Sequence, residues 1–209
     1  GYRAPPLSGA SMVLDPDTQK LHIFGGQGYH GLNQEFWTYD IAADSWNSFV
    51  YDTSTGPVAA GMVAGFDPSA SDDGIRPGLV LGGQTYHKLS NTGWCFDETG
   101  FSELSFTGDS DTLPPVVGMA GTFASNYGGI VAFGGQTYYQ LLDDAYLIRM
   151  VDDCEVKVTL LEEADDATSP APPPTVGSAM AWSPEDAEAF LIGGQTYHEL
   201  SDRVTGISP

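Results

Sequence analysis

The sequence predicts an all-β fold in which small four-stranded antiparallel sheets repeat along one chain. Three observations support this prediction. An apolar run ends in a Gly pair at four places, which begin at Gly25, Gly82, Gly134 and Gly193. The 209 residues include 26 Gly and 14 Pro, a composition that favours many tight turns between short elements. The segments between these turns are short and apolar or alternating, as strands are.

The four copies keep one register around the Gly pair. The pairs follow one another at intervals of 57, 52 and 59 residues, and Gln comes directly after each pair. Tyr stands four residues after the first Gly of each pair, and Leu stands seven after it. Upstream, Pro-x-x-x-Gly recurs as Pro5/Gly9, Pro57/Gly61, Pro114/Gly118 and Pro173/Gly177. Self-similarity at such a period is the signature of a repeat architecture.

Within the first copy, four strands are expected in order. Residues 8–14 form a Gly-containing apolar strand, 21–24 a strand too apolar for an exposed face, 36–39 a third, and 45–51 an alternating fourth. One small sheet of this kind cannot bury both faces, whereas radial stacking of several sheets can, which predicts a β-propeller. The Gly pair is expected where a strand end turns sharply beside a neighbouring aromatic ring, with no room for a Cβ.

The repeat boundaries divide the chain into four blades of one propeller segment. They cover residues 5–51, 57–106, 114–161 and 173–209, and the last blade is expected to lack its final strand. Residues 69–74 are interpreted as a loop insertion in the second copy. Residues 162–174, acidic and then Pro-rich, are interpreted as a long connection between the third and fourth blades.

The first copy resembles the Kelch repeat. Its Gly pair closes an apolar strand, Trp37-Thr38-Tyr39-Asp40 follows, and Trp46 comes seven residues after Tyr39. The second copy keeps Trp94-Cys95-Phe96-Asp97, and the third keeps Tyr146-Leu147-Ile148 with Arg149 in place of Asp. The resemblance implies a ring of six or seven blades, and about three and a half are supplied here. We therefore expect a segment of a larger propeller, or one whose open edge strand pairs with further sequence or a partner chain.

Composition narrows the classes of partner. Asp and Glu number 28 against 7 Lys and Arg, a formal charge of −21. Such a surface repels nucleic acid and anionic lipid, so the expected partners are proteins that are basic or tolerate salt, with no nucleic acid and no direct membrane insertion. An acidic surface of this kind also suits a salt-rich or extracellular setting. Cys95 and Cys154 form no metal or redox motif, and their oxidation state stays open.

The loops after the Gly pairs carry the candidate binding residues. They present Tyr29, His30, Tyr86, His87, Tyr138, Tyr139, Tyr197 and His198. Two interpretations stay open: a row of Tyr and His presented to a ligand, or a repeated structural clasp in which Gln and Tyr pack each loop on its neighbour. Histidines on separate blades diverge, so no metal site is predicted there.

No catalytic residue and no cofactor is predicted. Residues 26–31 match G-x-G-x-x-G, but a strand follows where a dinucleotide site needs a helix. No G-x-S-x-G nucleophile motif is present, and the acidic pairs lack calcium-loop spacing. The sequence therefore favours a protein-binding or scaffold module. The alternative is the propeller part of an enzyme or carbohydrate-binding protein whose site is completed by other blades or another domain.

Overall fold

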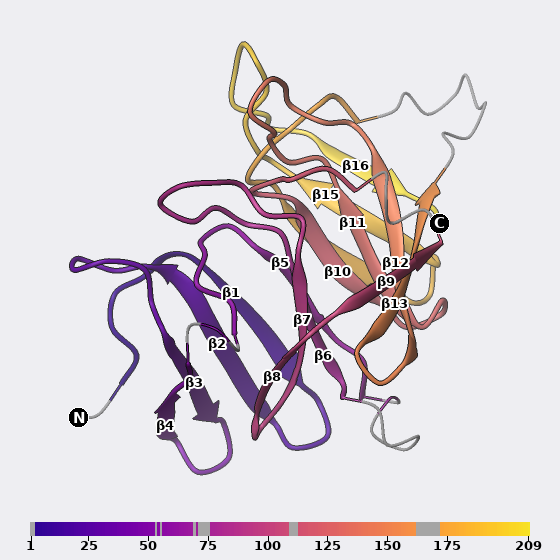
Figure 1. Ribbon diagram of the computed structural model, residues 1–209. Helices are drawn as coiled ribbons and strands as arrows, with labels where there is room; N and C mark the ends of the chain where they lie inside the picture. The colour runs from indigo at the N-terminus through magenta and orange to yellow at the C-terminus, as the bar shows by residue number, and fades with distance from the viewer. Residues whose placement is uncertain are drawn as a thin grey trace.

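The computed structural model describes residues 3–52, 54, 56–68, 70, 76–108, 113–161 and 172–209. In these residues the fold is all-β, and four small sheets follow one another as the blades of a β-propeller (Figure 1). The predicted fold class is thereby confirmed. No helix in the described part of the chain is long and apolar enough to cross a membrane. The expected loop insertion at 69–74, except Ala70, and the connection at 162–171 lie outside the described residues.

Each blade is a meander in which consecutive strands pair antiparallel. Blade 1 consists of β1 (Ser8–Asp15), β2 (Lys20–Gln27), β3 (Glu35–Asp40) and β4 (Ser45–Val50). Blade 2 consists of β5 (Val63–Phe66), β6 (Gly78–Leu81), β7 (Gly93–Asp97) and β8 (Gly100–Glu103). Blade 3 has β10 (Ala120–Ala124), β11 (Gly129–Phe133), β12 (Ala145–Asp152) and β13 (Glu155–Leu161). Blade 4 has β14 (Ala179–Ser183), β15 (Glu188–Ile192) and β16 (Val204–Ile207).

A fifth strand, β9 (Ser105–Gly108), adds to blade 3 a feature that the repeat pattern did not predict. The chain leaves β8 of blade 2 and pairs parallel with the outer strand β13 of blade 3, in the register Ser105 with Glu155. The Ser105 N–H also donates to the carbonyl of Cys154 at 2.8 Å. Blade 2 is therefore joined to blade 3 by backbone pairing at the outer edge as well as by packed faces.

The first strands of successive blades lie against one another, with β1 next to β5, β5 next to β10, and β10 next to β14. The Gly of each Pro-x-x-x-Gly forms this inner seam. Gly61 N–H donates to the Gly9 carbonyl at 2.8 Å, Gly118 to Gly61 at 2.8 Å, and Gly177 to Gly118 at 2.9 Å. All four glycines have φ between 65° and 71°. The Gly of the repeated motif therefore forms a backbone hydrogen bond to the next blade, and its positive φ is a conformation that glycine adopts more easily than other residues.

The Gly pairs have the backbone geometry that the sequence predicted but a different neighbour. Both residues of every pair have positive φ, from 62° to 93°. A Cβ on Gly26 would come within 2.8 Å of the backbone of Ala10 in the adjacent strand. The predicted aromatic neighbour is wrong for this position, because main chain of β1 occupies that space. The reason for glycine is the close approach of two backbones.

Apolar side chains fill the spaces between consecutive blades. Blades 1 and 2 enclose a cluster that includes Phe24, Phe36, Phe66 and Phe96. The clusters between blades 2 and 3, and between blades 3 and 4, contain mostly aliphatic residues. Because side chains alternate along each strand, one face of a blade points toward the next blade in the chain and the other face toward the preceding one. Each core is therefore shared by two consecutive blades.

His22 is buried in the first of these cores, and it gives the fold an acid-sensitive position. Its ring lies 5.3 Å from Phe36 and 5.9 Å from Phe66, and burial lowers the pKa of the imidazole. The same position in the other copies holds Leu79, Val131 and Phe190.

Stability should therefore fall as the pH drops below about 6.5, the pKa of His in the unfolded chain, since only that chain then gains a proton. One such proton lowers the free energy of unfolding by at most about 1.4 kcal/mol for each pH unit. Denaturant unfolding between pH 7 and 5.5 measures this slope. His22→Leu should flatten it, and the exposed-site control His30→Ala should leave it unchanged. An unchanged slope in His22→Leu contradicts the assignment.

Candidate functional site

The four loops after the Gly pairs are tight turns, and a Thr side chain closes three of them. In the second loop the Thr85 hydroxyl oxygen accepts hydrogen bonds from the N–H groups of His87 and Lys88, at 3.2 and 3.1 Å. Thr137 and Thr196 do the same in the third and fourth loops. The first loop has Gly28 instead, whose N–H donates to the Gly31 carbonyl at 2.8 Å. The Thr of Gln-Thr-Tyr is therefore the residue that closes the turn.

The Tyr of the second, third and fourth loops reaches back to the loop before it. The hydroxyl oxygen of Tyr86 accepts a hydrogen bond from Leu32 N–H at 2.8 Å. Tyr138 accepts one from Leu89 N–H, and Tyr197 one from Leu141 N–H, both at 2.6 Å. The clasp interpretation of the loops therefore has a direct structural basis in three Tyr–Leu hydrogen bonds. Tyr and Leu, which both recur at fixed offsets from the Gly pair, are the two partners of this clasp.

The clasp leaves other predicted residues exposed. Tyr29 is 98% exposed and Tyr139 95% exposed, and the rings of His30, His87 and His198 are on the surface as well. The structure brings neighbours within one loop together: the rings of Tyr29 and His30 lie 5.1 Å apart, and those of Tyr138 and Tyr139 6.4 Å apart. The loops themselves follow one another along the upper left side of Figure 1. They form a row of aromatic tips on a fixed backbone.

The clasp makes a specific prediction for Tyr138→Phe. The substitution keeps the ring and removes the oxygen to which Leu89 N–H donates. We expect the free energy of unfolding to fall by about 1 kcal/mol, the usual worth of one hydrogen bond. Tyr139→Phe in the same loop is the matched control and should change stability by less than about 0.5 kcal/mol. Urea unfolding of both variants tests this, and equal effects would contradict the clasp.

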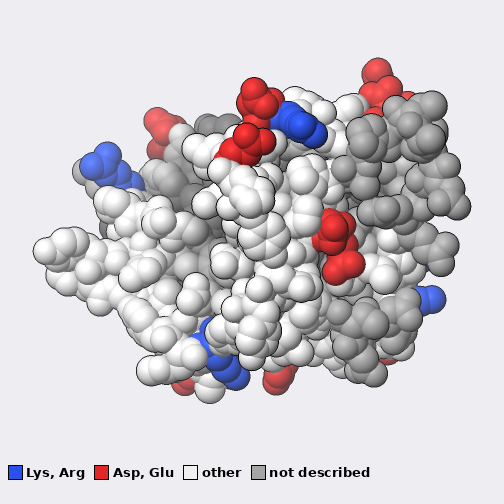
Figure 2. All heavy atoms as spheres, turned by 90° about the horizontal axis from the view of Figure 1, so that it is seen from above, with Lys and Arg blue, Asp and Glu red and all other residues white. Residues whose placement is uncertain are grey.

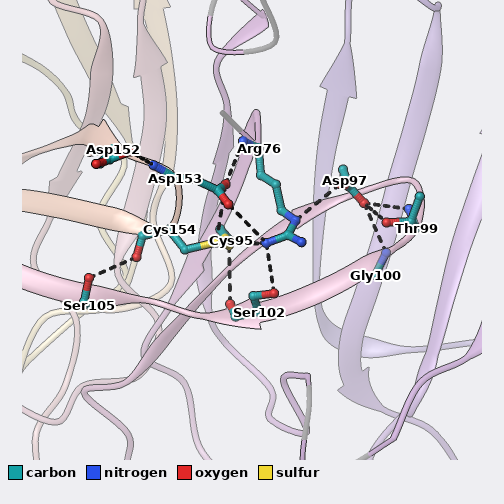
Figure 3. Close-up of polar contacts among 10 residues, drawn as sticks. All are labelled: Arg76, Cys95, Asp97, Thr99, Gly100, Ser102, Ser105, Asp152, Asp153 and Cys154. Atoms are coloured by element: carbon teal, nitrogen blue, oxygen red, sulfur yellow. Dashed lines mark hydrogen bonds and ion pairs between the residues drawn. A yellow bond between two sulfur atoms is a disulfide. The ribbon is translucent and has the colours of Figure 1, made fainter. Parts of the chain in front are cut away.

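A second cluster joins the outer edges of blades 2 and 3 (Figure 3). Cys95 on β7 and Cys154 in the turn between β12 and β13 form a disulfide across 59 residues, with their Cα atoms 5.3 Å apart. Arg76 lies beside it, and Nη1 is 3.1 Å from Cys154 Sγ and 2.9 Å from Ser102 Oγ. The oxidation state that the sequence left open is thus a disulfide in the structure.

The Arg76 guanidinium is held between carboxylates of two blades. Its Nε donates to Asp97 Oδ2 of blade 2 at 3.3 Å, and its Nη1 pairs with Asp153 Oδ2 of blade 3 at 3.7 Å. Burial raises the pKa of the Asp97 carboxyl, but hydrogen bonds from Thr99 and the charge of Arg76 outweigh this, so the pKa lies below its usual value. The Asp97 carboxyl is therefore ionised at neutral pH.

Cys95, Asp153 and Cys154 place possible ligand atoms within 4.8 Å of one another. Both sulfurs are used in the disulfide, however, and soft metals bind thiolates rather than disulfide sulfur. The adjacent guanidinium also opposes a cation. The chemistry of this cluster is that of a covalent and ionic joint between blades.

Sequence reasoning missed this joint, and the reason is spatial. Cys95 stands in the third strand of one copy, while Cys154 stands in a turn of the next, so the two cysteines share no repeat position. The signal that could have found them is the prediction that consecutive blades pack face to face. That prediction brings a strand of one copy beside a hairpin of the next.

Charge is distributed over the surface rather than gathered at one site. Seen from above, Asp and Glu side chains form separate small groups, and much of the surface between them is uncharged (Figure 2). Some acidic side chains also have local structural roles. Asp15 accepts hydrogen bonds from the backbone of Asp17 and Thr18, and Asp97 accepts one from that of Thr99. These residues stabilise hairpin turns. The acidic pairs at 72–73, 162–163 and 165–166 lie outside the described residues.

Comparison with protein-family models and with curated proteins finds no match to this chain.

Proposed function

We propose that the chain is a protein-binding module, and that its partner binds the row of loops after the Gly pairs. The observation that carries this proposal is the exposure of aromatic rings on loops whose backbone is already fixed. Tyr29 and Tyr139 are almost fully exposed, and neither has the Tyr–Leu hydrogen bond that occupies Tyr86, Tyr138 and Tyr197.

Aromatic rings on rigid loops suit binding for two reasons. Tyr is enriched in protein interfaces because it combines apolar area with a polar end. The Thr-closed turns and the Tyr–Leu bonds also hold the loops before any partner arrives. Less conformational entropy is then lost on binding than with a mobile loop.

We further propose that the chain is a Kelch-like propeller and that its partner is a basic or salt-tolerant protein. A Kelch-like propeller presents loops on one side as an assembly surface, although the fold does not dictate function. A net charge of −21 attracts a basic partner over a long range. In high salt the repulsion from this charge is screened, so a partner that is not basic can also bind. The chain thus acts as a scaffold in a larger protein or assembly.

The double variant Tyr139→Ala/His87→Ala tests the proposal at the middle of the row. Immobilised wild-type and variant chains are incubated with extract of the source cells, and retained proteins are quantified by mass spectrometry. Val151→Ala, an exposed apolar position on β12, is the control. We expect one set of proteins retained by the wild type and the control, and reduced about tenfold in the double variant, equivalent to about 1.4 kcal/mol.

Two results would contradict the proposal. Retention that is identical for all three chains would place binding elsewhere. Saturable binding of oligosaccharides that depends on Tyr139, without any retained protein, would support the carbohydrate-binding alternative instead. Thermal melting of each variant, expected to match the wild type, separates loss of binding from loss of fold.

A further inference from the structure

The two cysteines of the disulfide between blades 2 and 3 differ in exposure. Cys95 is fully buried on β7, within the core that these blades share, whereas Cys154 is partly exposed in the turn between β12 and β13. A thiolate breaks a disulfide by attacking one of the two sulfur atoms, and the other sulfur leaves. A thiol from solution therefore reaches Cys154 rather than Cys95, and Cys95 is the leaving group.

The leaving sulfur carries a negative charge in an apolar setting, where it needs a cation. Cys95 belongs to the same buried cluster as Leu79 and Ile148, and an isolated thiolate there is costly because burial disfavours an unpaired charge. Arg76 Nη1 lies 3.7 Å from Cys95 Sγ and 3.1 Å from Cys154 Sγ (Figure 3). The guanidinium therefore stabilises the charge that develops on Cys95 as the bond breaks.

The carboxylates around Arg76 fix the guanidinium and favour the same direction of attack. Arg76 Nε donates to Asp97 Oδ2 at 3.3 Å, and the backbone N–H of Arg76 donates to Asp153 Oδ1 at 3.2 Å. Asp153 Oδ1 also lies 3.7 Å from Cys154 Sγ, where its charge disfavours a thiolate. Negative charge is therefore accommodated better on Cys95 than on Cys154.

Backbone pairing keeps the two cysteines close to each other after the bond breaks. Cys154 is held by the Ser105 N–H, which donates to its carbonyl at 2.8 Å, and Ser105 itself belongs to the strand β9 that pairs with β13. Cys95 stays in register between Leu79 and Ser102 within blade 2. The disulfide can therefore open and form again while the chain remains folded.

We propose that Cys154 is a site of thiol–disulfide exchange, at which a small-molecule thiol of the glutathione class opens the covalent joint between blades 2 and 3, and that Arg76 assists by stabilising the Cys95 thiolate. This site is independent of the proposed partner surface on the loops.

The exchange takes two steps. In the first, the thiolate of the small molecule bonds to Cys154 Sγ, the S–S bond breaks, and Cys95 keeps the electron pair and takes up a proton. In the second, another small-molecule thiolate attacks the sulfur of the first one, so that their disulfide leaves and Cys154 becomes a thiol. Two small thiols are oxidised and one protein disulfide is reduced. The small-molecule disulfide drives the reverse reaction, so the joint responds to the thiol redox balance around the protein.

Mapping of the mixed disulfide tests the site and the direction of attack. The folded chain is incubated with glutathione without denaturant, and the reaction is stopped with acid. The chain is then unfolded, its free thiols are alkylated with N-ethylmaleimide, and its peptides are identified by mass spectrometry. We expect glutathione on Cys154 and maleimide on Cys95, no adduct in Cys95→Ala/Cys154→Ala, and recovery of the disulfide after addition of oxidised glutathione. Glutathione found mainly on Cys95, or no adduct unless the chain is unfolded first, overturns the proposal.

The rate of exchange tests the role of Arg76. Arg76→Gln removes the cation and should slow the reaction with glutathione about tenfold, because a leaving thiolate without a charge partner leaves more slowly. Arg76→Lys keeps the charge and should retain most of the rate. Asp97→Asn is the matched control: it removes the carboxylate of one ion pair of Arg76 but leaves the guanidinium, so it should not slow exchange.

A purely structural role of Arg76 predicts the opposite sign, because a loosened joint exposes the disulfide and speeds its exchange. Arg76→Gln that reacts as fast as the wild type, or faster, therefore contradicts the assigned role. The same rates are measured in urea well below the unfolding transition. A wild-type rate that rises in proportion to the unfolded population would place the reaction in the unfolded chain and overturn the proposal.

Discussion

Phe96→Ala is expected to lower the free energy of unfolding by about 3–5 kcal/mol, the range found when a buried aromatic ring is removed. Phe96 is fully buried on β7 and lies at the centre of the core between blades 1 and 2. Its ring is 4.9 Å from Phe24 and 5.5 Å from Phe101. The loss is large because the rings around the cavity come from two sheets whose backbones cannot close together.

Equilibrium unfolding in urea, followed by Trp fluorescence and by circular dichroism, measures this loss. Tyr139→Ala removes an aromatic ring of similar size from an almost fully exposed position and should change stability by less than about 0.5 kcal/mol. If Phe96→Ala costs less than about 1 kcal/mol, the faces of blades 1 and 2 are not packed as described.

The register of the repeat predicted most of the fold. The Gly pair, the Pro-x-x-x-Gly motif and the alternation of β1 to β4 placed the strands and the order of the blades, because short-range turn chemistry and a period of two determine them. One exception was the neighbour of the Gly pair, which is the backbone of Ala10 rather than a ring. A repeated glycine indicates that there is no room for a Cβ, but it does not indicate which atoms occupy that space.

The candidate site was predicted in part. The repeated Gln and Tyr suggested a clasp between loops, and in the structure Tyr forms it with Leu rather than Gln, as in the hydrogen bond from Leu89 N–H to Tyr138. The sequence analysis did not predict the strand β9 or the disulfide, because both depend on how blade 2 lies against blade 3. Contacts that occur once, between different repeat positions, leave no periodic signal in a single sequence.

Removal of the disulfide has the second large expected effect. The bond between Cys95 and Cys154 closes a loop across 59 residues, so the chain-entropy model gives a stabilisation of about 4 kcal/mol. The double variant Cys95→Ala/Cys154→Ala should lower the free energy of unfolding by about that amount, within the usual range of about 2–5 kcal/mol. Since a domain is commonly stable by only about 5–15 kcal/mol, this change alone brings it close to unfolding at elevated temperature.

A reducing agent separates the covalent contribution from the effect of the substitutions. Dithiothreitol should lower the melting temperature of the wild type and leave that of the double variant unchanged. The parallel strand β9 and the contacts of Arg76 with Asp97 and Asp153 would still join blades 2 and 3, so the reduced chain should keep its β-sheet circular dichroism below the transition. A wild-type melting temperature that is insensitive to dithiothreitol, with thiol titration showing two free thiols, would mean that the bond does not stabilise the joint.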